Sequence, residues 1–121
     1  GEIGGFDGRF GGTSVLEDAD ITARIRKTGH RMRFCPQAVV IHLRLVSGGC
    51  RPTNLRNYYY WYGHNYFLYA LKNLPRIWTP IFLAERVVSL FSTAVRNWDF
   101  GLLSTGLRGL QAGYRSFLAG A

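Results

Sequence analysis

Three acidic residues occupy four consecutive positions near the start of the chain, in the segment Glu17-Asp18-Ala19-Asp20. The pattern predicts a helix start, because free backbone N–H groups and the helix dipole stabilise carboxylates there. Ser14 and Glu17 fit a capping box, and Asp18 or Asp20 is an alternative cap. Capping explains most acids at helix starts, but three like charges at close range need a cation or a function. An ionised carboxylate in a cleft can accept the proton of a substrate hydroxyl as a general base.

Two further features lie near this acidic segment in the sequence. Residues 4–7 belong to a loop with tight backbone turns, because five glycines fall between Gly4 and Gly12. His42 follows the apolar, β-branched run 38–41, which is typical of a strand buried on both faces. The carboxyl ends of such strands open onto ligand-binding clefts in α/β proteins. The alternative for His42 is a hydrogen-bonded histidine at a sheet edge.

Four segments together resemble a known protein family in order and spacing: GGFD (4–7), EDADI (17–21), RIRKTGH (24–30) and FCPQAVVIH (34–42). The chain resembles the family 2 glycosyltransferases, specifically the second half of their GT-A catalytic domain. It is most similar to the branch of bacterial rhamnosyl- and galactofuranosyltransferase-like enzymes. The aromatic segment 58–73 also resembles the region C-terminal to the catalytic domain in that branch.

This resemblance implies an inverting transfer of a sugar from a nucleotide-sugar donor to a hydroxyl of a lipid-linked or saccharide acceptor, in cell-envelope polysaccharide or glycolipid synthesis. Asp18 would match the general base, with Glu17 and Asp20 orienting the helix start. His42 would match a histidine that, in some members, completes the coordination of Mg²⁺ or Mn²⁺ on the diphosphate. The loop residues that would help to shape the donor and acceptor pocket are Gly4, Gly5, Phe6 and Asp7.

The resemblance also implies that part of the enzyme is missing from these residues. We find no glycine-rich start followed by the family's Asp-x-Asp metal motif. Asp18-Ala19-Asp20 has those letters but stands in the place of the base motif. We therefore expect the chain to be the C-terminal part of a longer enzyme and to be inactive alone.

The elements that would position these residues predict an α/β fold. Residues 1–50 are expected to be the C-terminal half of a GT-A catalytic domain, with one helix that runs to about Thr28 and stops at Gly29. Two short strands are predicted next, over 31–34, where basic and apolar residues alternate, and over 38–41.

Residues 51–121 are expected to form a separate aromatic and basic helical region. Three mainly amphipathic helices are predicted over 55–74, 81–96 and 100–118, joined by short turns. Pro75 and Pro80 punctuate the sequence between the first two.

Charge is distributed unevenly along the 121 residues, whose formal net charge is +8. The first twenty residues carry −4 and the remainder carries +12. Basic, aromatic helices suit an anionic membrane surface, and a peripheral place at the cytoplasmic face of the cell membrane would fit. A bundle packed on the rest of the enzyme explains the pattern as well. A nucleic-acid-binding module is the competing class, disfavoured because the aromatics fall in a helical run without a known binding motif.

The remaining composition excludes several other classes of protein. Cys35 and Cys50 make no disulfide framework and are predicted to be free thiols in a reducing compartment. A zinc site built from these cysteines with His30 and His42 is disfavoured, because the gaps match no compact ligand pair. No run of 18 uncharged apolar residues is present, so no membrane span is predicted.

Overall fold

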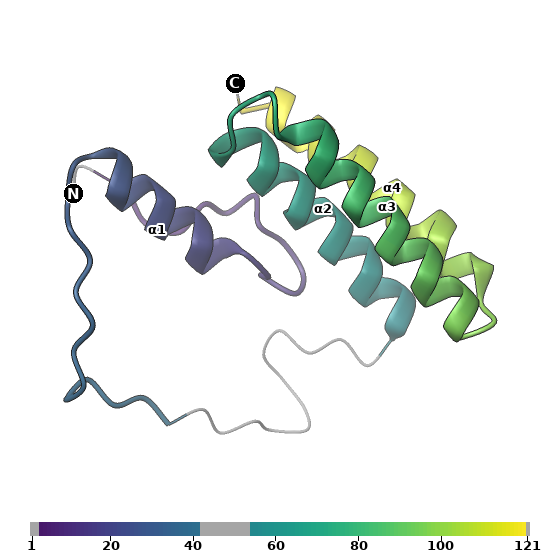
Figure 1. Ribbon diagram of the computed structural model, residues 1–121, viewed down its shortest axis with the longest axis horizontal. Coiled ribbons are helices and arrows are strands. Elements are labelled where there is room, and N and C mark those ends of the chain that lie inside the picture. Colours follow the sequence, from purple (N-terminus) through teal and green to yellow (C-terminus); the bar gives the residue numbers. More distant parts are fainter. Residues whose placement is uncertain (1–2, 42–53, 121) are drawn as a thin grey trace.

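Four helices form the regular structure of residues 3–41 and 54–120, the part of the chain that this computed structural model describes. They are α1 (Glu17–Lys27), α2 (Leu55–Asn73), α3 (Thr79–Arg96) and α4 (Phe100–Leu118). Helices α2, α3 and α4 form an up-down-up bundle, and α1 lies beside α2 (Figure 1). The four predicted helices are therefore confirmed, each within a few residues of its expected bounds, although α2 is not amphipathic.

The prediction of an α/β fold is wrong for the described residues, which contain no β-strand. Residues 31–34 and 38–41, predicted as strands, lie in an exposed extended segment interrupted by a turn at Pro36-Gln37. Phe34 and Val40 are 86% and 87% exposed. A strand needs a neighbour that completes its backbone hydrogen bonds. No described segment lies alongside to do so, and alternation of apolar residues cannot replace that partner.

Glycines bring α2 and α4 close together along their length. Gly106, Gly109 and Gly113 recur on one face of α4 and are all buried. A Cβ added at Gly109 would lie far inside van der Waals contact with the Tyr60 carbonyl oxygen of α2. One added at Gly113 would meet the carbonyl oxygen of His64 in the same way. The apolar core of the bundle consists of Leu68, Ala70, Leu90, Ala94, Leu102 and Leu110.

Replacing Gly109 by alanine is therefore expected to destabilise the fold. Alanine favours a helix by about 1 kcal/mol over glycine, but the two backbones must separate to admit the methyl group. Such overpacking typically costs about 1–3 kcal/mol. Urea denaturation should show a net loss of up to about 2 kcal/mol. Gly8→Ala is the matched control, because a Cβ there meets nothing within 4 Å, and an equal loss in that variant would contradict the packing argument.

Candidate active site

The approach to α1 is strained, and it differs from the predicted capping box. Helix α1 begins after Leu16, whose φ is 71°, and no side chain caps it. Ser14, the predicted cap, has a φ of 50°. Left-handed backbone at non-glycine residues costs of order 1 kcal/mol or more and is concentrated at functional sites. The two strained residues, Ser14 and Leu16, thus directly precede the acidic segment 17–20.

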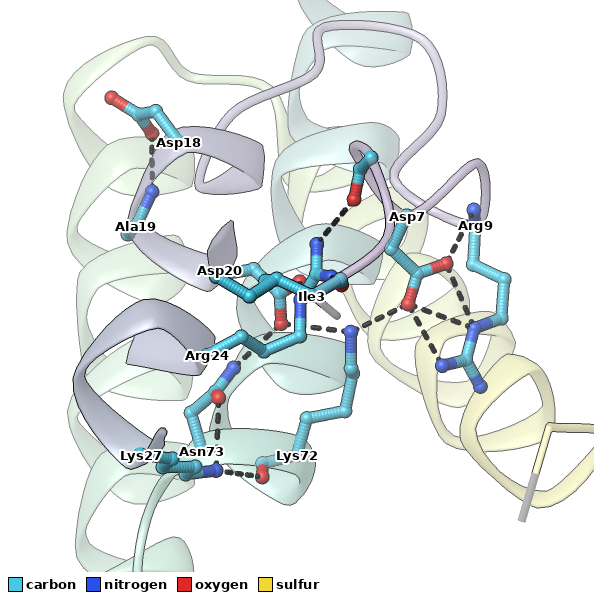
Figure 2. A network of polar contacts seen from close by, with 11 residues as sticks. Ile3, Asp7, Arg9, Asp18, Ala19, Asp20, Arg24, Lys27, Lys72 and Asn73 are labelled. Atoms are coloured by element: carbon cyan, nitrogen blue, oxygen red, sulfur yellow. Dashed lines mark hydrogen bonds and ion pairs between the residues drawn. The ribbon is translucent and has the colours of Figure 1, made fainter. Parts of the chain in front are cut away.

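Asp18 is the exposed acid of this segment. Its Oδ1 accepts a hydrogen bond of 2.8 Å from the backbone N–H of Ala19, in the first turn of α1. Figure 2 shows the Asp18 carboxylate at some remove from the other acids drawn. Neither Asp18 nor the half-buried Glu17 forms an ion pair with any described residue. Asp18 therefore presents a carboxylate to solvent at the positive end of a helix.

Asp20, two residues further on, has the opposite environment. Its side chain is fully buried and accepts three hydrogen bonds, from Lys72 Nζ at 2.7 Å, Asn73 Nδ2 at 2.8 Å and Arg24 Nε at 2.9 Å. Burial raises the pKa of the carboxyl, but these donors and the positive charge of Lys72 outweigh burial and hold the pKa below its usual value. Asp20 is thus a fixed anion that attaches α1 to the end of α2.

Lys72 joins this anion to the glycine-rich loop. Its ammonium lies between the carboxylates of Asp20 and Asp7 (Figure 2). Asp7 also accepts from Arg9, at 3.0 Å from Nε and 2.8 Å from Nη2. The hydrogen bonds from Arg9, with Lys72, hold the pKa of Asp7 well below its usual range despite partial burial. Asp7 is therefore part of a structural ion-pair network.

Arg24 attaches the rest of the loop to α1. Its Nη1 and Nη2 donate to the backbone carbonyls of Ile3 at 2.6 Å and Gly5 at 2.8 Å. Gly4, between these carbonyls, has a φ of 66° that favours glycine. Phe6 stays 62% exposed. The backbone of the loop is thus held by one guanidinium, which is itself paired with Asp20.

Helix α2 also supports the segment between the loop and α1. The side-chain amide of Asn65, which is fully buried, donates to the carbonyl of Gly11 at 3.0 Å. A Cβ at Gly12 would overlap the indole of Trp61. Trp61, Asn65 and Lys72 lie on one side of α2, spaced by four and seven residues. This spacing of polar residues in an aromatic helix is the sequence signal that would have pointed to Asn65 and Lys72, which sequence reasoning missed.

The described residues do not supply a metal site. No group of three or more His, Cys, Asp or Glu side chains converges among them. Asp7 and Asp20, the best-placed carboxylates, are already neutralised by Lys72 and arginines. His42 and Cys50 lie outside the described part of the chain, so the metal role predicted for His42 stays a prediction.

These features define a small helical bundle with a buried ion-pair network at one end and an exposed carboxylate on the attached helix. No protein-family model, curated protein or solved structure matches the chain. Among the described helices, none is both long and apolar enough to cross a membrane.

Proposed function

We propose that the chain is the C-terminal part of a family 2 glycosyltransferase that transfers a sugar with inversion from a nucleotide-sugar to an acceptor hydroxyl. The observation that carries the proposal, together with the sequence resemblance, is the contrast between Asp18 and Asp20. The acid that matches the family's base is open to solvent at a helix N-terminus. Its neighbour is buried and bound by three donors.

This contrast gives each acid a distinct part in the reaction. Asp18 accepts the proton of the acceptor hydroxyl while the oxygen forms a bond to the anomeric carbon and the bond to the nucleoside diphosphate breaks. Asp20 holds α1 against α2, so the first turn that carries Asp18 keeps its position. Because general-base catalysis depends on geometry first, a rigidly attached helix start favours Asp18 over a carboxylate on a free loop.

The glycine-rich loop has a related part in the proposal. Gly4, Gly5 and Phe6 would help to shape the donor and acceptor pocket, and Arg24 holds their backbone in place. Asp7 is predicted with them as a pocket residue, but its carboxylate forms ion pairs with Arg9 and Lys72. Its part is to fix the loop. The Mg²⁺ or Mn²⁺ that the resemblance implies would need ligands from outside the described residues, and no step is assigned to it.

The same resemblance places the reaction at the cytoplasmic face of the cell membrane, in the synthesis of cell-envelope polysaccharide or glycolipid, with a lipid-linked or saccharide acceptor. Nucleic acid is not among the proposed partners. The competing interpretation, a basic helical module without catalysis, leaves the strained approach to an exposed acid on α1 without an explanation.

A transfer assay tests the proposal directly. The polypeptide from the complete open reading frame is incubated with labelled nucleotide-sugars, divalent cation and an acceptor lipid fraction. We expect a glycosylated product of inverted anomeric configuration, and no product from the 121-residue chain alone. Failure of the complete polypeptide to bind or turn over any nucleotide-sugar would refute the function. Turnover by the 121-residue chain that is abolished by Asp18→Asn would refute the fragment hypothesis alone.

A further inference from the structure

Helix α3 buries an arginine beside Leu90 and Ala94 on its inner side and leaves apolar residues exposed on the opposite side. Its inner side buries Arg86, which is 7% exposed and whose guanidinium carbon lies 4.8 Å and 4.9 Å from the ring centres of Tyr62 and Tyr66. The opposite side carries an exposed apolar stripe, which we call the outer face of α3. Its members and exposed fractions are Ile81 (59%), Val88 (64%), Phe91 (52%) and Val95 (43%).

Tryptophan and arginine stand at both ends of this face. Trp78 precedes α3 and Trp98 follows it, and they are 57% and 87% exposed. Trp98 has a φ of 51°, a strained backbone angle in the turn that leads to α4. Arg76 and Arg96 are exposed beside them. Tryptophan is enriched where apolar and aqueous phases meet, and arginine side chains there can reach phosphate headgroups.

The acids near this face offset its basic ends only in part, because Glu85 is a single carboxylate beside Arg76 and Arg96. Glu85 accepts a hydrogen bond of 3.1 Å from the Tyr66 hydroxyl. Burial is the largest cause that raises the pKa of Tyr66 to about 12, and this hydrogen bond is the second. Asp99 is paired with Arg56 at 2.9 Å. The apolar surface also continues from Trp78 and Ile81 into an apolar pocket of about 410 Å³ between α2 and α3.

We infer that the outer face of α3 docks on a lipid bilayer containing anionic phospholipid, with the helix lying in the plane of the interface. None of the described helices could cross the bilayer, whereas an amphipathic helix with aromatic and basic ends suits its surface. A second copy of the chain fits less well. The stripe formed by Ile81, Ala84, Val88, Phe91 and Val95 covers about two heptads, and a coiled coil needs about three or four.

Vesicle co-sedimentation of the full chain tests this surface without any assay of sugar transfer. We expect binding to vesicles of phosphatidylcholine and phosphatidylglycerol that exceeds binding to phosphatidylcholine alone and falls as salt increases. Val88→Asp should lower the partition coefficient by at least about tenfold, because it replaces apolar contact with a charge. Val39→Asp is the matched control, since Val39 is 79% exposed in the extended segment away from α3.

The possible results separate a lipid bilayer from a second copy of the chain. Retained binding by Val88→Asp, an equal loss in Val39→Asp, or no binding of the natural chain to anionic vesicles would overturn the inference. A concentration-dependent dimer that Val88→Asp dissociates, with no vesicle binding, would identify a second copy instead. Circular dichroism should show that both variants keep their helices. The inference stands apart from catalysis, because Asp18→Asn should bind vesicles as the natural chain does.

Discussion

Replacing Asp18 by asparagine is expected to lower kcat for sugar transfer by about 10²–10⁴-fold in the complete enzyme. Asparagine keeps the size and the hydrogen bond to the Ala19 N–H but cannot accept a proton from the acceptor hydroxyl. Because Asp18 is exposed and forms no ion pair with the described residues, the melting temperature and the dissociation constant for the donor should change little. Initial rates, donor titration and thermal unfolding measure the three quantities.

Two variants of neighbouring acids show whether this loss belongs to Asp18. Glu17→Gln removes a charge one residue away and should leave kcat within a few fold. Asp20→Asn should instead lower the melting temperature, because the change leaves Lys72 and Arg24 without the anion that they share. If Glu17→Gln abolished transfer and Asp18→Asn did not, the base would be Glu17 and the proposed assignment would be wrong.

The helices could be predicted from the sequence because each has a local signal. Prolines and glycines delimit them, and α3 and α4 carry apolar residues at helical spacing. For α1, the predicted N-cap Ser14 lies two residues before the observed N-cap, Leu16. The structure uses a left-handed Leu16 and no side-chain cap, whereas the capping box was inferred from residue types alone.

Strand pairing and the contacts of Lys72 depend on residues distant in the sequence, and this is why neither is predicted correctly. Residues 31–34 and 38–41 have strand-like patterns, but a strand exists only with a neighbour. The roles of Asp7 and Asp20 depend on Lys72, which lies 65 residues after Asp7. Without that contact, the sequence assigns Asp7 to a binding pocket and leaves open whether a cation or a function accounts for the crowded acids. In the structure, Lys72 and Arg24 supply the positive charge that balances Asp20. Asp18 and Glu17 are therefore the two acids of the segment that still need a cation or a function.

Replacing Lys72 by methionine is expected to lower the free energy of unfolding by about 3 kcal/mol. Methionine keeps much of the aliphatic stem, but it removes the only cation that contacts both Asp7 and Asp20 in the described residues. Removing one partner of a buried ion pair leaves an uncompensated charge, which typically costs about 3–5 kcal/mol. Because Arg9 and Arg24 remain beside the carboxylates, the loss of unfolding free energy should lie at the lower end of this range. Urea denaturation at neutral pH measures it.

Acidification provides an independent test of the same contact. The pKa values of Asp7 and Asp20 are lowered in the folded state, so their contribution is present above the ordinary carboxyl pKa of about 4 and is lost as pH falls through the lowered values. The stability difference between the natural chain and Lys72→Met should therefore narrow below about pH 4. Lys27→Met is the matched control, since Lys27 is exposed and donates only to the Lys72 carbonyl and the Asn73 side chain. A difference that stayed constant with pH would mean that Lys72 acts through packing, and the network would not be what joins the loop, α1 and α2.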